Sequence, residues 1–132
     1  MRDVYLLRAE IEALATAVAC ERMTDEQFDR IEAVHEEIRN HRGGDGEDLA
    51  VLNRRLHFTI YHAGSELIAS HASSLWQLFP PRVTIWADPD AARALAADHD
   101  EIIAALRDRD AKRAQNCARD HVLHAAKLRE HL

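Results

Sequence analysis

Four side chains with metal-binding donors stand out in this chain of 132 residues. Asn53 and His57 lie four residues apart in one predicted helix, while His99 and His121 each lie within a later predicted helix. Because positions i and i+4 share one face of a helix, the Asn53 amide and the His57 imidazole would lie side by side. If His99 and His121 also point inward, three helices bring one oxygen and three nitrogen donors together. That donor set suits a divalent metal ion, Zn, Ni or similar.

The residues around these histidines favour burial. His99 lies at the centre of a predicted apolar stripe, and its acidic neighbours Asp98 and Asp100 are expected to point to the sides; the stripe consists of Leu95, Ala96, Ile102 and Ile103. Three imidazoles buried in one bundle need partners, and a shared metal would satisfy all three. The alternatives are a hydrogen-bonded polar cluster without metal, or histidines in separate places.

The other six histidines have no matching set of partners. A lone histidine on a helix is usually a surface or partly buried residue, and we expect this for His35, His41, His62, His71, His124 and His131.

Length and composition indicate one domain that acts in the cytoplasm. No apolar run approaches the roughly 20 residues that span a bilayer, and no export signal is visible. A net charge of −6 and scattered basic residues argue against direct contact with nucleic acid. Cys20 and Cys117 lie in alanine-rich stretches without CxxC spacing, which indicates two reduced core thiols.

Apolar residues at intervals of three and four predict an all-α protein, an antiparallel bundle of six or seven helices. Breaks are expected at Gly43-Gly44 and at Pro80-Pro81, and the segment between 42 and 47 is expected to be a flexible loop. The predicted helices cover about 3–21, 24–42, 48–62, 66–78, 88–107 and 110–132, with a short element near 83–86.

Three local features are specific enough to test. Thr24 and Gln27 form a capping-box pattern, and Gly64 is expected to end a helix in the left-handed conformation. The first helix is expected to turn one apolar face inward, composed of Leu6, Leu7, Ile11, Leu14, Ala15 and Val18.

Four segments in order resemble the FCD domain, the ligand-sensing domain of the FadR subfamily of GntR transcription regulators. Residues 7–12 resemble its opening Leu-Arg-x-x-Leu-Glu, and Leu56-His57 with 63–65 resemble its Phe-His and Ser-Gly-Asn. Residues 99–110 resemble its most recognisable segment, and His121 falls at its final histidine. The resemblance covers almost the whole chain, so 1–132 is expected to be a single FCD-like effector-binding domain.

This resemblance implies a metal site of Asn53, His57, His99 and His121, in which Asn53 replaces the more common Asp. It also implies a homodimer and a small carboxylate effector bound at the open metal positions. Arg8 matches the family's first-helix arginine and is the best candidate to hold that acid; weaker candidates are Arg54, Tyr61 and Arg82. Family members carry a winged helix-turn-helix domain before this one, so the chain is either part of a longer regulator or a free-standing domain.

An alternative function is a metal-dependent enzyme, a lyase or isomerase acting on a small carboxylate. An open coordination position could polarise a substrate, and Tyr61 or a histidine could act as base. However, no Asp or Glu occupies a same-face position beside His57, His99 or His121, which counts against a hydrolase. A purely structural helical module would leave the four donors unexplained.

Overall fold

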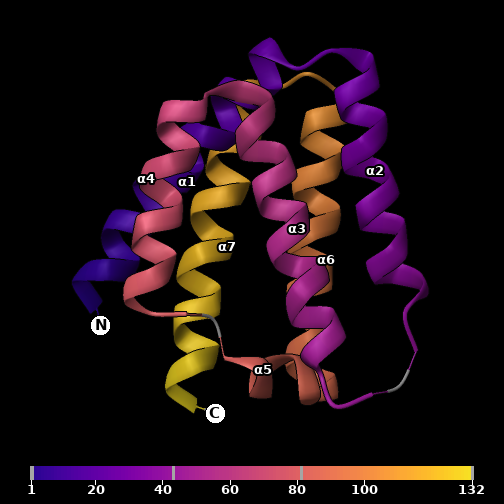
Figure 1. The fold of residues 1–132 in the computed structure, drawn as a ribbon, viewed down its shortest axis with the longest axis vertical. Helices are drawn as coiled ribbons and strands as arrows, with labels where there is room; N and C mark the ends of the chain where they lie inside the picture. Colours follow the sequence, from indigo (N-terminus) through magenta and orange to yellow (C-terminus); the bar gives the residue numbers. More distant parts are fainter. Residues whose placement is uncertain (1, 43, 81, 132) are drawn as a thin grey trace.

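The computed structural model describes residues 2–42, 44–80 and 82–131. Within these ranges the chain forms seven helices and no strand: α1 (Arg2–Arg22), α2 (Asp25–Asn40), α3 (Glu47–Gly64), α4 (Glu66–Leu78), α5 (Val83–Ala87), α6 (Pro89–Arg107) and α7 (Ala111–His131). The long helices run side by side, and the short α5 lies across one end of the bundle (Figure 1). The predicted all-α bundle is therefore confirmed. The breaks predicted at Gly43-Gly44 and Pro80-Pro81 are confirmed: α2 ends at Asn40 before α3 begins at Glu47, and α4 ends at Leu78 before α5 begins at Val83. Gly43 and Pro81 themselves lie outside the described ranges.

The helix starts follow the local sequence signals. Thr24 accepts a hydrogen bond from the Gln27 amide at 3.1 Å, and the Gln27 side chain accepts one from the Thr24 amide at 2.8 Å. The predicted capping box is thus confirmed. Asp88 accepts from the Ala91 amide at 2.9 Å and begins α6. Gly46 begins α3 with a φ of 95°, a conformation that favours glycine.

The predicted inward face of the first helix was wrong for its leucines. Leu6, Leu7 and Leu14 keep 45–50% of their surface exposed. The buried face of α1 instead carries small and polar residues: Ala9, Ala13, Ala15, Ala19, Arg8, Glu12 and Thr16. Because α1 packs against α3, α4 and α7, small side chains are needed for close approach on several sides.

Gly64 serves the same close packing and does not form the left-handed cap that was predicted. Helix α3 continues through Gly64, and the capping residue is Ser65 with a φ of −148°. A Cβ atom on Gly64 would lie 2.5 Å from the backbone nitrogen of Ala19. Glycine at this position therefore allows the end of α3 to lie directly on α1.

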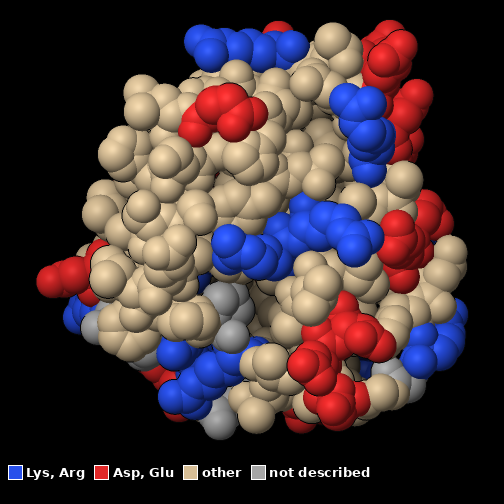
Figure 2. Space-filling model, in the orientation of Figure 1, with Lys and Arg blue, Asp and Glu red and all other residues tan. Residues whose placement is uncertain are grey.

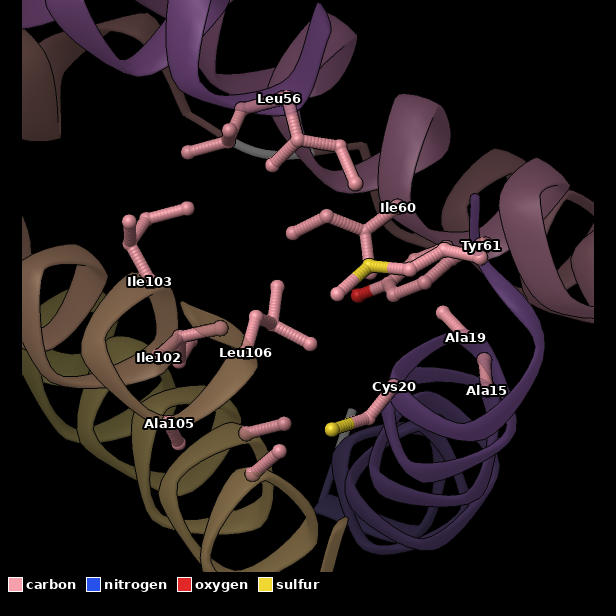
Figure 3. Packing of buried hydrophobic residues seen from close by; sticks show 14 of the residues in the cluster. Ala15, Ala19, Cys20, Leu56, Ile60, Tyr61, Ile102, Ile103, Ala105 and Leu106 are labelled. Carbon is pink, nitrogen blue, oxygen red and sulfur yellow. The ribbon is translucent and has the colours of Figure 1, made fainter. Parts of the chain in front are cut away.

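The main apolar core joins α3, α6 and α1. Figure 3 shows side chains of α3 pointing toward those of α6 and α1; the labelled residues include Leu56, Ile60, Tyr61, Ile103, Leu106, Ala15, Ala19 and Cys20. Close to this core, the inward faces of α3, α6 and α7 also carry the four donors predicted from the sequence. None of the described helices has the length and hydropathy needed to cross a membrane.

Candidate metal centre

The structure brings His57, His99 and His121 together in the interior of the bundle. All three are buried, and one ligand nitrogen from each lies within 4.8 Å of the others. Their ring centroids are 4.9–5.1 Å apart. Residues far apart in the sequence thus form one cluster because α3, α6 and α7 each turn one imidazole inward.

Hydrogen bonds to the outer nitrogens determine which atoms of His57 and His121 face the cluster. The Tyr61 hydroxyl donates its proton to Glu12 at 2.7 Å, so it can only accept from Nδ1 of His57, 3.3 Å away. Asp98 accepts from Nδ1 of His121 at 3.0 Å. When both imidazoles are neutral, each therefore has its lone pair on Nε2, and these two Nε2 atoms are 3.3 Å apart.

In the neutral forms, two lone pairs at that distance repel each other unless a cation lies between them, whereas a protonated ring would donate a hydrogen bond to the other. Two nitrogens bound to one tetrahedral zinc ion at about 2.0–2.1 Å are roughly 3.3–3.4 Å apart. The separation of 3.3 Å between the Nε2 atoms of His57 and His121 is therefore the spacing that a shared ion needs.

Further atoms at the site that could bind a metal have no hydrogen-bond partner. Both ring nitrogens of His99 and the side-chain oxygen of Asn53 are buried and form no hydrogen bond. Leaving a buried polar group unpaired costs roughly 1–3 kcal/mol, so the unpaired atoms of His99 and of Asn53, which lies one helical turn before His57, need an explanation. The residues present fit a divalent ion held by three imidazoles and one amide oxygen.

Burial keeps His57 and His99 uncharged. Burial lowers the pKa of His57 well below its usual value, and the nearby charges of His121 and Arg8 act in the same direction. Burial also lowers the pKa of His99, with additional effects of His121, His57 and His35. Since a metal binds the neutral imidazole, both rings are in the ligating form at neutral pH.

A small cavity of about 40 Å³ adjoins the cluster. Its walls include Asn53, His57 and His121 together with the pair Arg8 and Glu12. Aromatic and apolar side chains complete the walls, namely Tyr5, Trp76, Ile85, Trp86, Leu95, Val122 and Ala125. The cavity thus joins the donor cluster to a buried arginine.

Arg8 is held in place by Glu12 and by two aromatic rings. Its Nε lies 2.6 Å from a Glu12 oxygen, and its guanidinium lies 5.0 Å from the Tyr5 ring and 4.6 Å from the Trp76 ring. Burial alone would lower the pKa of Arg8, but the charge and hydrogen bond of Glu12 outweigh this, so the pKa is raised. Arg8 therefore keeps its positive charge although it is buried.

The other predicted ligand-binding residues are placed differently. Arg82 lines the cavity from the start of α5. Tyr61 contacts His57 through its hydroxyl, which lies 3.3 Å from Nδ1 of that ring. Arg54 lies over the Phe58 ring at 4.7 Å and lines an outer groove between α3 and α4.

Two carboxylates beside the site were missed by sequence reasoning. Asp98 was expected to point to the side, but its Oδ2 accepts hydrogen bonds from both His121 and His124, at 3.0 and 2.8 Å. Burial alone would raise the pKa of Asp98, but the hydrogen bonds and charges of these two histidines lower it overall. Glu12 is connected to the site by the hydrogen bond that it accepts from Tyr61. The sequence signal that could have revealed Glu12 is its spacing of four residues from Arg8, with which it pairs.

His35 was also misjudged. It is buried, and its Nε2 lies 2.8 Å from a carboxylate oxygen of Asp100. The expectation of a surface or partly buried position was therefore wrong for His35. His124 is partly buried, as expected, and like His35 it contacts an aspartate of α6.

The fold and the site define an all-α sensor-like bundle with an enclosed cluster of imidazoles. The sequence profile of the FCD domain matches residues 3–124, and the chain therefore belongs to the FCD domain family. The family is the ligand-sensing domain of GntR-type regulators, so a ligand-sensing regulatory role is the general function of this domain.

Comparison with solved structures shows the same fold. The chain is similar to E. coli McbR/YncC, with a TM-score of 0.79, 20% sequence identity and coverage of 98% of this chain. It spans 64% of the length of that protein. No curated protein matches the chain in sequence.

Proposed function

We propose that this domain is the metal-dependent sensor of a small organic acid within a GntR/FadR-type transcription regulator. Asn53, His57, His99 and His121 would hold one divalent ion, which would supply open coordination positions for an acid. The observation that carries this proposal is the buried cluster of His57, His99 and His121, in which both His99 nitrogens have no hydrogen-bond partner, like the buried oxygen of Asn53 in the wall of the adjoining cavity.

The cavity limits the size of the acid. One water needs roughly 10–15 Å³ of such volume, so a cavity of about 40 Å³ has room for about three water-sized groups. That corresponds to an acid of two or three carbons. Arg8 supplies a buried positive charge in the wall of the same cavity, which suits a carboxylate.

A regulator of this kind acts as a dimer, and α1 and α4 offer a face for a second copy. Leu7 and Leu14 lie on one side of α1, and Leu67 and Leu78 lie on one side of the neighbouring α4, all 45–70% exposed. Figure 2 shows that the surface over α4 carries few charges, whereas charged residues gather over α2 and α3. We infer that this α1/α4 face is the dimer interface, because apolar patches of this kind mark interaction sites.

The enzyme alternative has less support. Tyr61, which could have acted as base, donates its proton to Glu12. Burial raises the pKa of Tyr61 well above its usual value, and Glu12 adds to this effect. A phenol that holds its proton so firmly is a poor base.

Metal content tests the proposal most directly. Untagged protein purified without chelator should contain about one equivalent of metal by mass spectrometry. His99→Ala should lose it, whereas the matched variant of an exposed histidine, His71→Ala, should retain it. A metal-free wild type, with His99→Ala equally stable, would refute the proposal and would leave a polar core of ordinary histidines.

A further inference from the structure

The cavity wall contains a buried carboxylate, Glu12, that the donor cluster does not use. Its side chain is fully buried and accepts from Arg8 Nε at 2.6 Å, from Arg8 Nη2 at 3.4 Å and from the Tyr61 hydroxyl at 2.7 Å. An ionised carboxylate has about four acceptor positions, so these three bonds leave about one available. Glu12 also lines the cavity, where a ligand would meet it.

Arg8 has donors left for a ligand while it stays bonded to Glu12. A guanidinium carries five N–H groups. Only Nε and Nη2 of Arg8 contact Glu12, and the structure gives Arg8 no other hydrogen-bond acceptor among the described residues. Because the rings of Tyr5 and Trp76 lie against the guanidinium, its free edge is the part that can bind an acid group. The acid group would then pair with Arg8, and the substituent next to the acid group would lie beside the Glu12 carboxylate.

We propose that Glu12 determines the specificity of this cavity. It selects a small monocarboxylic acid that carries a hydrogen-bond donor next to its acid group, and it rejects dicarboxylates. A second carboxylate would face the negative charge of Glu12 at close range, and like charges at that distance repel strongly in a buried site. A hydroxyl would instead donate to the remaining acceptor position of Glu12. Specificity of this kind depends on the unfavourable contact as much as on the favourable one.

This inference rests on the proposed acid-binding function, and matched ligands can test the two separately. Lactate, propionate, pyruvate and malonate each have three carbons but differ in the donor and in the second charge. Isothermal calorimetry on the metal-loaded full chain should show lactate binding at least about tenfold more tightly than the other three, a difference of about 1.4 kcal/mol.

Glu12→Gln tests the residue itself. It keeps the side-chain size but removes the negative charge. We expect the ratio of lactate affinity to malonate affinity to fall about tenfold. Glu10→Gln is the matched control, since Glu10 lies on the same helix, is exposed and pairs with Arg119 instead. The control should leave the ratio unchanged.

The outcomes separate the two proposals. If no acid binds the metal-loaded wild type, the acid-sensing function itself is wrong. If acids bind but the wild type does not prefer lactate, or folded Glu12→Gln keeps the wild-type ratios, Glu12 has only a structural role and the inference is overturned.

A measurement without the variant covers the case in which Glu12→Gln fails to fold. A hydroxy acid can also gain affinity by chelating the ion, which propionate does less well. Titration of the metal-free wild type removes that effect and leaves Arg8 and Glu12 as the binding groups. Preference for lactate over propionate that persists there supports Glu12, and equal binding of the two acids overturns the inference. If neither acid binds without metal, the comparison of lactate with malonate on the metal-loaded wild type decides, because malonate also chelates an ion and is disfavoured only by its second charge.

Discussion

Nδ1 of His121 lies 3.0 Å from Oδ2 of Asp98, and this hydrogen bond turns the other ring nitrogen toward the donor cluster. Removing such an outer partner of a metal-binding histidine typically lowers metal affinity about 10–100-fold. We therefore expect Asp98→Asn to bind zinc about tenfold to a hundredfold more weakly in competition with a chromophoric chelator. Asp120→Asn, an exposed aspartate on the same helix as His121, should bind like the wild type. Equal affinities for the two variants would contradict this role of Asp98.

The amide of Asn53 should make the site hold metal less tightly than a carboxylate would. A neutral oxygen attracts a cation less strongly and leaves the charge of a bound ion uncompensated. We expect Asn53→Asp to tighten metal binding about tenfold, roughly 1.4 kcal/mol, and to weaken the binding of an acid anion. Calorimetry with both ligands measures the two effects. Asn116→Asp, exposed on α7, is the control, and unchanged or weaker metal affinity in Asn53→Asp would refute the argument.

Acid should destabilise the metal-free protein through its buried histidines. The folded state holds the pKa of His57 and of His99 well below the usual value, which is about 6.5 in the unfolded chain. Below about pH 6.5 the unfolded state therefore binds protons that the folded state does not. This stability is fully present above that pH and decreases as the pH falls, by about 1.4 kcal/mol per pH unit for each such group.

Urea unfolding with chelator present, from pH 7.5 to 5.5, measures this effect. His99→Leu removes one of the two groups, so its unfolding free energy should depend on pH less steeply than that of the wild type. His71→Leu removes an exposed histidine and should keep the wild-type slope. Parallel slopes for His99→Leu and the wild type would show that His99 does not titrate in this way.

A charge on the α1/α4 face should break the proposed dimer. Leu14 is 45% exposed on α1, and Leu14→Glu would place a carboxylate between the two copies. Sedimentation equilibrium should show the dissociation constant rising at least about tenfold. Val51 is 57% exposed on α3, outside that face, so Val51→Glu should not change the constant. Dissociation by both variants, or by neither, would place the interface elsewhere.

Helix boundaries and the inward faces of the donors could be predicted from sequence because the signals are local, whereas their convergence on one site was implied by the resemblance to the FCD domain. The capping box at Thr24 and the aspartate at Asp88 fix helix starts through short hydrogen bonds within one turn. The spacing of Asn53 and His57 fixes their common face, and the apolar residues around His99 indicated its burial.

The face of α1 could not be predicted because it depends on distant partners. Counting apolar residues favoured Leu7 and Leu14, but the contacts of α1 with α3 require small residues such as Ala19 opposite Gly64. Likewise, the role of Glu12 depends on Tyr61, which is 49 residues away in the sequence. No local pattern in the chain reveals that contact.

The separation of the ligands along the chain has a consequence for folding. His57 and His121 are 64 residues apart in sequence, yet their Nε2 atoms lie 3.3 Å from each other. An ion bound between them would close a long loop, as a disulfide does, and closure of long loops removes much conformational entropy from the unfolded chain. Metal supply would then control how much of this protein is folded in the cell, in addition to whether the cavity can hold its ligand.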